Sequence, residues 1–350
     1  MEFAYVGSYT TPKRGGLGSG GISVFSRTSA EEPWKEEQIF EIMNPSFLCF
    51  ARGKRNLYAV RADGDIVTAF AVDEKTGRLA YLNEKHIGFD NGVFVTADAQ
   101  SRFLFVASPG GVVSIRLNDD GSLGELCDIV VPKGDLGPLG PGQRRGCSHQ
   151  ICFDREGRYL IEPNKGFDQL NTYEVDQRTG CMTQVASAKM PQSCCPRHIA
   201  FHPTLPVAYL LTEWIGRVIS CRYENGSFTP FEILPTTPKT FVGLRNVGAE
   251  IAVHPSGRFV YTSNRGYSSI AVFKVTEDGG LESVSWTTEG VAKPRFFTLS
   301  PDGKQLYCAN EESHSVTLYD IDESTGALTF VDTVMRASAP ACVLFKVSEQ

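Results

Sequence analysis

Hydrophobic and polar positions along this chain repeat roughly every fifty residues. In most copies a basic residue precedes an apolar pair that ends in an aromatic or aliphatic side chain, and a short run leads on to a polar residue. The last residues of these pairs are Tyr5, Tyr58, Phe105, Ile161, Tyr209, Tyr261 and Tyr307. A repeat of this length predicts blades, which are small sheets that stack on their neighbours to bury both faces.

The copy between residues 250 and 286 shows the elements of one blade. Residues 250–254, 258–264, 269–275 and 281–286 read as strands, and Pro-Ser-Gly, Gly-rich and Asp-Gly turns separate them. Four antiparallel strands in each of seven copies predict an all-β, seven-bladed β-propeller that occupies residues 1–350 as one domain. A parallel β-helix would need a much shorter period.

The two ends of the chain predict how the ring closes. The N-terminus begins on the second strand of a copy, at residues 3–8, and the missing first strand lies at residues 341–347, which are mostly apolar. We therefore expect the C-terminal strand to complete the first blade, so that no sheet edge stays open.

Composition and charge narrow the class of protein. The net charge of −6 favours neither nucleic acid nor an anionic membrane as a partner, and no apolar run is long enough to cross a bilayer. The first ten residues enter a strand pattern without the features of a signal peptide, so a cytoplasmic location is expected. The ten cysteines are then expected to be free, buried thiols.

The repeat also predicts which side chains share one rim of the ring. The start of each innermost strand and the end of the antiparallel second strand should meet at the same rim. The residues selected in this way are His149, Arg197, Glu213, Arg265 and Arg295, with Asn264, Lys165 and Glu250 beside them. Three long irregular segments, 10–21, 132–146 and 235–248, open at this rim and could cover a small ligand.

Other charged and histidine positions have structural interpretations. His202 and His254 lie in His-Pro turns at the opposite rim, where a structural role is expected. His198 follows Arg197 on a strand and should point the other way, into the packing between blades. Paired arginine and glutamate can also form an ion-pair girdle, but a histidine and surplus arginines favour a ligand site.

The residues expected at the rim suit an anionic ligand and a proton transfer. Arginine binds carboxylate or phosphate with two hydrogen bonds, and His149 can move a proton near neutral pH. Glu213 can orient His149, hold a water or pair with Arg265. No nucleophile elbow, phosphate-binding glycine loop or zinc-spaced cluster occurs in the sequence, so neither a metal nor a cofactor is expected. Addition or removal of water at an activated carbonyl fits this set.

Four segments carry a family resemblance: YVGSYT at 5–10, PRHIAFHP at 196–203, HPSGRFVYTSNRG at 254–266 and SPDG at 300–303. The whole chain resembles the seven-bladed lactonase family, which includes propeller-type 6-phosphogluconolactonases and fungal carboxy-cis,cis-muconate cyclases. The resemblance implies a site made of His149, Arg197, Glu213 and Arg265. Three segments depart from the lactonase pattern: Gly92-Val93-Phe94 replaces Pro-Cys-His, Cys147-Ser148-His149 replaces His-Ala-His, and Asn164-Lys165-Gly166 replaces Asp-Leu-Gly.

These observations leave three hypotheses. The first is metal-independent hydrolysis of a sugar lactone, with 6-phosphogluconolactone preferred. In it His149 activates water, Arg197 and Arg265 stabilise the oxyanion and bind the anionic group, and Arg295, Asn264, Lys165 and Glu250 contact the substrate. The second is a cyclase or isomerase acting on a carboxylated diene acid with the same residues. The third is a non-catalytic propeller that binds other proteins.

Overall fold

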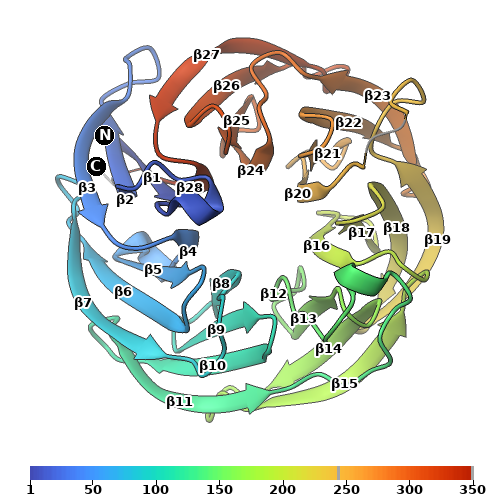
Figure 1. Cartoon of the computed structure of the whole chain (residues 1–350), viewed down its shortest axis with the longest axis horizontal. Coiled ribbons are helices and arrows are strands. Elements are labelled where there is room, and N and C mark those ends of the chain that lie inside the picture. Colours follow the sequence, from blue (N-terminus) through green and yellow to red (C-terminus); the bar gives the residue numbers. More distant parts are fainter. Residues whose placement is uncertain (243–244, 348–350) are drawn as a thin grey trace.

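The computed structural model describes residues 1–242 and 245–347, and within them 28 strands form seven four-stranded antiparallel sheets. Figure 1 shows the sheets arranged as blades around a central axis. The seven-bladed all-β prediction is confirmed. Three short 3-10 turns are the other elements of the described residues: η1 (Pro12–Arg14), η2 (Arg52–Lys54) and η3 (Gly140–Gly142). None of the helices in these residues could span a membrane.

Each blade contributes one strand to each of four concentric layers. The innermost strands are β28 (Pro340–Val347), β4 (Pro45–Phe50), β8 (Phe94–Ala97), β12 (Cys152–Phe153), β16 (Pro196–Phe201), β20 (Gly248–Val253) and β24 (Pro294–Leu299). The second strands are β1 (Glu2–Ser8), β5 (Asn56–Arg61), β9 (Phe103–Ser108), β13 (Tyr159–Asn164), β17 (Val207–Thr212), β21 (Phe259–Asn264) and β25 (Gln305–Asn310).

The two outer layers complete the sheets. The third strands are β2 (Gly21–Arg27), β6 (Ile66–Val72), β10 (Gly111–Leu117), β14 (Gln169–Val175), β18 (Arg217–Glu224), β22 (Ser269–Val275) and β26 (Ser315–Ile321). The outermost strands are β3 (Lys35–Glu41), β7 (Leu79–His86), β11 (Leu123–Val130), β15 (Met182–Lys189), β19 (Ser227–Pro235), β23 (Leu281–Thr287) and β27 (Leu328–Arg336).

Burial explains why the middle strands read as continuous apolar runs. Every residue of β9, β13, β17 and β21 is buried, because neighbouring blades cover both faces of the sheet. The outermost strands instead mix exposed and half-buried positions, as in β15 and β27. The apolar segment that recurs in the sequence therefore corresponds to the second strand of each blade, which is the fully buried strand in four of them.

The ring closes through the two ends of the chain, as predicted. β28 pairs antiparallel with β1 from Glu2↔Val347 to Ser8↔Pro340, and β1 pairs with β2 on its other side. The first blade is therefore built from both ends of the chain, and the innermost strand of the ring is not left as an open edge.

Repeated hydrogen bonds join one blade to the next. The hydroxyl of Tyr5 donates to the carbonyl of Gly77, in the hairpin between β6 and β7, at 2.7 Å. Tyr58, Tyr209 and Tyr261 make the same bond to the hairpin glycines of their following blades, Gly121, Gly279 and Gly326. Where the repeated position holds Phe105 or Ile161, a hydroxyl of the third strand donates instead: Ser114 to Gly180 and Thr172 to Gly226. The repeated tyrosine and the repeated hairpin glycine are thus the donor and the acceptor of one hydrogen bond between neighbouring blades.

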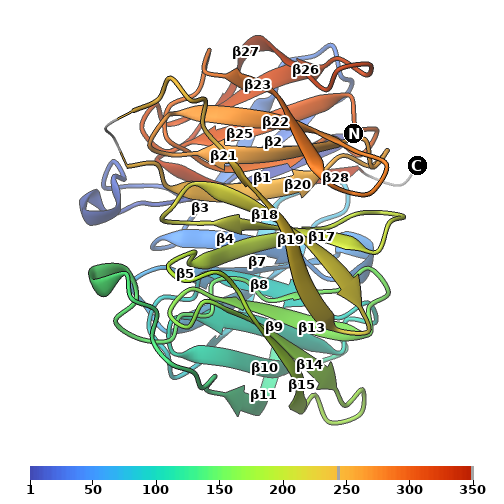
Figure 2. The ribbon, with the colours of Figure 1, turned by 90° about the vertical axis from the view of Figure 1, so that its right-hand side faces the viewer.

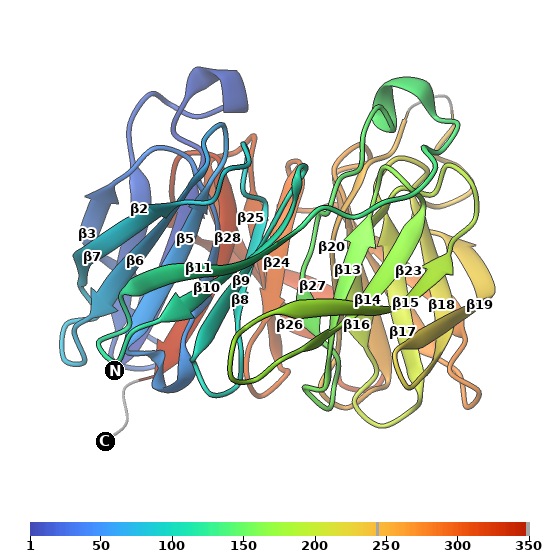
Figure 3. The same ribbon diagram turned by 90° about the horizontal axis from the view of Figure 1, so that it is seen from below.

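The three long connections project from one face of the ring. They join β1 to β2, β11 to β12 and β19 to β20, and Figures 2 and 3 show their described residues on the face opposite the N-terminus. This supports the predicted common rim for segments 10–21 and 132–146. Part of segment 235–248 lies outside the described residues.

The cysteines follow the sequence prediction in part. All ten are free, and Cys194, Cys195, Cys221, Cys308 and Cys342 are buried. Cys181 is exposed, which corrects the expectation of burial, because it directly follows the hairpin turn between β14 and β15.

Candidate active site

Bulges at the start of the innermost strands turn side chains toward the axis. Pairing with the second strand skips one residue in β4, β16 and β24, and two residues in β20. The skipped residues are Ser46, Arg197, Arg295 and the pair Ala249–Glu250. A bulged residue is unpaired and the strand bends there, which re-aims its side chain. Several residues that the repeat selects for the rim are therefore held on bulges.

Three charged side chains from adjacent blades form a cluster at the mouth of the ring. Lys165, Glu213 and Arg265 each follow the last residue of a second strand. Nζ of Lys165 lies 2.5 Å from Oε2 of Glu213, and Nη2 of Arg265 lies 2.8 Å from Oε1. Burial alone would raise the pKa of Glu213, but the two cations and nearby Arg197 hold it well below its usual range. Glu213 is therefore a carboxylate that fixes two cations.

Arg197 lies deeper and lacks a carboxylate partner among the described residues. Its side chain is buried, Nη1 donates to the carbonyl of Ala249, and the same Nη1 lies 3.3 Å from Nε2 of His198. Its Nε is buried without a hydrogen-bond partner. Burial, and then the charge of Arg265, lower the pKa of Arg197 to about 9. A buried guanidinium without a counter-charge is costly and attracts an anion.

His149 lies in the connection before β12, beside Arg197. Its backbone N–H donates to the carbonyl of Pro163 at 3.1 Å, and the isolated bridge between Ser148 and Asn164 fixes the adjacent backbone. Only 6% of the residue is exposed, and Nδ1 is buried without a partner. Burial, reinforced by Arg197 and Lys165, lowers the pKa of His149 well below its ordinary value. At neutral pH the ring is therefore uncharged and has an unpaired nitrogen.

Arg295 and Tyr9 form a second part of the mouth. The guanidinium carbon of Arg295 lies 5.0 Å from the centre of the Tyr9 ring, within cation–π range. Nη1 of Arg295 lies 3.6 Å from Oε1 of Glu311, and Lys293 lies 3.3 Å from the other oxygen of that carboxylate. Sequence reasoning found Arg295 but missed Tyr9, which lies just beyond the end of β1.

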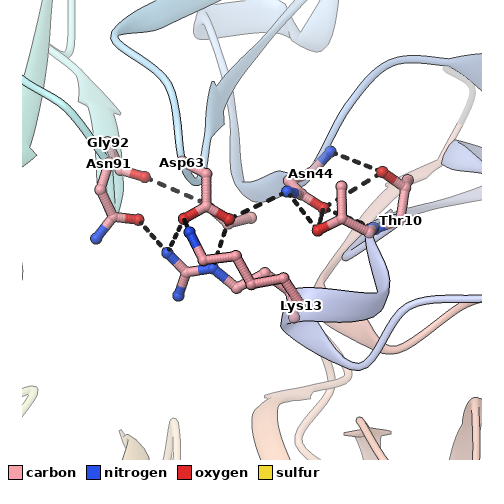
Figure 4. Close-up of polar contacts among 9 residues, drawn as sticks. Thr10, Lys13, Asn44, Asp63, Asn91 and Gly92 are labelled. Atoms are coloured by element: carbon pink, nitrogen blue, oxygen red, sulfur yellow. Dashed lines mark hydrogen bonds and ion pairs between the residues drawn. The ribbon is translucent and has the colours of Figure 1, made fainter. Parts of the chain in front are cut away.

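The connection after Tyr9 is fastened across the rim. Figure 4 shows Asn44 accepting hydrogen bonds from the Thr10 backbone and side chain, and Asp63 binding Lys13. Arg14 binds both oxygens of Asp63 at 2.8 Å. Its guanidinium carbon lies 5.7 Å from the Tyr9 ring, which brings a further cation to the mouth.

Two predicted roles change because of the bulges. His198 does not point away from the site: it is 2% exposed, its ring centre lies 5.2 Å from that of His149, and it contacts Arg197. Simple strand alternation failed because Arg197 is the skipped residue of the bulge in β16. Glu250 was expected to contact substrate, but its Oε1 accepts hydrogen bonds from His198 Nδ1 at 2.8 Å and from the Ile251 backbone at 3.0 Å.

Asn264 was also expected to contact substrate, but its amide is used within the protein. It is fully buried, its Nδ2 donates to the Thr236 carbonyl and the Ser269 hydroxyl, and its Oδ1 accepts from Asn246. Asn164 and Asn310, at the same position in other blades, hold neighbouring loops in a similar way. This repeated position fixes the connections between blades.

Aromatic rings close the channel beneath the charged cluster. Phe47 stacks on Phe94 with ring centres 4.0 Å apart, and Phe296 lies 5.8 Å from Phe47. The edges of this group meet the His198 ring. Phe47, His198 and Phe296 directly follow the skipped bulge residues Ser46, Arg197 and Arg295, so the position after the bulge was the signal for this floor. Phe94 adds an apolar ring to it.

Comparison with known proteins identifies the family. A family model described as "Lactonase, 7-bladed beta-propeller" matches residues 3–345. The chain belongs to the seven-bladed β-propeller lactonase family. The 6-phosphogluconolactonase of Bacillus subtilis strain 168 is 32% identical to it, over 97% of each protein. Among solved structures, the periplasmic gluconolactonase of Pseudomonas aeruginosa superposes with a TM-score of 0.90, 25% identity and full coverage of both chains. A protein from Lactobacillus plantarum gives 0.89 and 27% over 99% of both.

Membership defines the chemical class of this lactonase. It is an enzyme that hydrolyses a cyclic ester, which removes the non-catalytic scaffold from consideration. In the part of the lactonase that the structure describes, no group of three or more His, Cys, Asp or Glu side chains could hold a metal ion. The chemistry available at its mouth is that of the imidazoles of His149 and His198, several guanidinium groups, a lysine and the carboxylate of Glu213.

Proposed function

We propose that this lactonase hydrolyses a sugar lactone that carries an anionic group, with 6-phosphogluconolactone as the preferred substrate and without a metal ion. The observation that carries the proposal is Arg197, a buried guanidinium with an unpaired Nε and no carboxylate partner among the described residues. The name of the Bacillus relative supports the same substrate.

In the proposed reaction His149 is the general base. The uncharged imidazole removes a proton from water, the water oxygen attacks the lactone carbonyl, and Arg197 donates hydrogen bonds to the resulting oxyanion. The bond between the carbonyl carbon and the ring oxygen then breaks, and that oxygen takes the proton from His149 as it leaves as a hydroxyl. The product is an open-chain carboxylic acid, which ionises to the carboxylate and releases one proton to solvent at neutral pH.

The other charged residues bind the substrate's anionic group in this proposal. Arg265 and Lys165 are held in place by Glu213, and Arg295 lies near Tyr9 on the blade that follows that of Arg265. Each guanidinium offers two donors to a phosphate or carboxylate. Asn264 has no such role, since its amide is occupied.

A lactone panel tests this function. Proton release would be followed with 6-phosphogluconolactone, gluconolactone and a carboxylated muconate, with and without EDTA, and the spontaneous hydrolysis would be subtracted. We expect the highest kcat/KM for the phosphorylated lactone, equal rates with EDTA, and no turnover of the muconate. Turnover of the muconate alone would favour the cyclase. A loss of rate with EDTA that a divalent ion restores would contradict the metal-free reaction.

A further inference from the structure

The side chain of His198 lies between a carboxylate and a guanidinium, in the wall of the channel. Its Nδ1 is 2.8 Å from Oε1 of Glu250, and its Nε2 is 3.3 Å from Nη1 of Arg197. His198 and Arg197 are each 2% exposed, and Glu250 is 7% exposed. The three groups therefore form a buried chain that ends at the cation assigned to the oxyanion.

The hydrogen-bonding capacities of the three groups select one form of the imidazole. An ionised carboxylate can only accept, so Nδ1 of His198 must carry the hydrogen that points to Glu250. An uncharged ring with Nδ1–H has a lone pair on Nε2, and this lone pair can accept from the Arg197 N–H. The other tautomer, or the imidazolium, would aim an N–H at an N–H. Burial lowers the pKa of His198 to about 4, so the ring stays uncharged at neutral pH.

Neighbouring groups fix the Glu250 end and the central imidazole of this chain. The backbone N–H of Glu250 donates to the Ser263 hydroxyl at 2.9 Å, and Oε1 also accepts from Ile251. The rings of Phe94 and Phe47 meet the His198 ring nearly at right angles, with centres 5.4 and 6.4 Å away. The imidazole therefore has little freedom to rotate or to exchange its partners.

We propose that Glu250 and His198 are positioning residues: Glu250 fixes the Nδ1–H tautomer of His198, and Nε2 of His198 orients the Arg197 guanidinium toward an anion at the mouth. This inference rests on the proposed function only for the identity of that anion. It assigns a role to two residues that do not contact the reacting atoms.

The chain contains a matched control for this arrangement. Nδ1 of His86 lies 2.9 Å from Oδ1 of Asp65, almost the same distance, but both side chains are solvent-exposed at 71% and 34%. An exposed pair of this kind is screened by water and holds its geometry weakly. Replacing Asp65 removes the same chemical group without touching Arg197.

The first measurement observes the tautomer in the unmodified protein and uses one variant only for assignment. In ¹⁵N-labelled protein at pH 7, the two ring nitrogens of His198 would be assigned by their absence from the spectrum of His198→Gln. We expect a protonated Nδ1 and an unprotonated Nε2 in a single tautomer. A protonated Nε2, or rapid exchange between tautomers, would overturn the proposal even if all variants lost activity.

The second measurement separates positioning from folding. Binding of inorganic phosphate would be titrated in the intact enzyme, Glu250→Gln and Asp65→Asn, together with the melting temperature of each. We expect Glu250→Gln to weaken phosphate binding about tenfold or more and to mix the His198 tautomers, because an amide can donate to Nδ1 as well as accept. Asp65→Asn should leave both unchanged. An unchanged affinity in a folded Glu250→Gln would contradict the proposal.

The two proposals fail in different ways. If the tautomer and the phosphate affinities are as expected but no lactone is hydrolysed, the positioning chain stands and the proposed function does not. If lactones are hydrolysed but His198 holds the other tautomer, the proposed function stands and the positioning chain does not.

Discussion

The two rims of this propeller are built from the same repeat, but they use histidine in opposite ways. At the rim away from the long connections, His202 and His254 use both ring nitrogens: Nε2 bonds the carbonyl of a turn glycine in the next blade, and Nδ1 bonds groups of its own turn. At the mouth, His149 is equally buried, but its Nδ1 has no partner. Every ring nitrogen of His202 and His254 is paired, whereas the mouth keeps polar atoms of buried His149 and Arg197 unpaired.

Cavity size alone would select the rim of the His-Pro turns rather than the mouth. A groove of about 830 Å³ lies between the third and fourth blades at the rim of the His-Pro turns. Its arginines have protein partners: Arg102 binds Gln177 and lies 3.7 Å from Asp98, and Arg158 lies 3.8 Å from Glu174. At the mouth, Nδ1 of His149 and Nε of Arg197 and Arg265 are buried without a hydrogen-bond partner, whereas the groove lining contains one such atom, Oδ2 of Asp98. Unsatisfied buried donors and acceptors, more than volume, indicate where a ligand belongs.

Removal of the closing strand β28 should have the largest effect on stability. It opens the ring on which both rims are built. Deletion from Ser338 onward removes β28, exposes the edge of β1, and breaks the bond between the Tyr9 N–H and the Ala339 carbonyl. We expect aggregation or loss of cooperative melting. A soluble truncated protein with the melting temperature of the full chain would contradict this closure.

Substitutions at the mouth should remove activity without unfolding the protein. His149→Gln deletes the proposed base and should lower kcat by about 10²–10⁴-fold. Arg197→Ala deletes the oxyanion donor and should cost about 10²–10³-fold. The melting temperatures should stay close to that of the unmodified chain, since neither side chain fills a hydrophobic core. Full turnover by His149→Gln on a confirmed substrate would show that the base is another group.

A buried acid behind the mouth should make stability depend on pH. Glu162 is fully buried on β13, its oxygens accept hydrogen bonds from the Asn164 and Asn171 amides, and burial raises its pKa from 4.5 to about 7. Since the folded state binds this proton more tightly, the contribution is present below pH 4.5 and is lost as pH rises through 7. It amounts to about 3 kcal/mol.

Chemical denaturation at pH 5 and pH 8 measures this contribution. The unfolding free energy of the parent protein relative to Glu162→Gln should fall by about 2.5 kcal/mol between the two values. Asp154→Asn is the control at the opposite rim, where Asp154 accepts hydrogen bonds from the backbone N–H groups of Arg158 and Tyr159. An unchanged difference for Glu162→Gln would mean that the acid is solvated.

A substitution at the rim of the His-Pro turns should give the smallest effect, and this effect should be on stability alone. His254→Gln disturbs the bonds to the Gly303 carbonyl and to the Ser256 backbone and should cost about 1–2 kcal/mol. The kcat/KM on the preferred lactone should be unchanged, as measured on the same preparations as His149→Gln. A comparable loss of activity in both variants would erase the distinction between the rims.

The sequence predicted the fold because its repeat is also the unit of packing. The aromatic at the end of each apolar pair and the hairpin glycine recur together because they meet across blade boundaries, as Tyr5 and Gly77 do. Ring closure followed from a missing strand at one end of the chain and a surplus strand at the other.

The site was predicted less completely, for reasons that are local. His149, Arg197, Glu213, Arg265 and Lys165 do lie at one mouth, since position within a repeat fixes the rim. The direction of a side chain depends on bulges that alternation does not show, so His198 was misplaced. Rim position also does not distinguish a side chain that faces the axis from one that holds the connections between blades. Asn264 holds such a connection, because its amide bonds Thr236 and Asn246.

A crystal structure with bound 6-phosphogluconate tests whether the mouth that contains Arg197 and His149 is the substrate site. We expect the product to lie at the mouth, with its carboxylate within hydrogen-bond distance of Arg197 and close to His149. Its phosphate should be bound by at least one of Arg265, Lys165 and Arg295. The same soak of Arg197→Ala should leave the mouth without the product. Product bound in the groove of the opposite rim, or an unchanged complex in Arg197→Ala, would show that the mouth is not the substrate site.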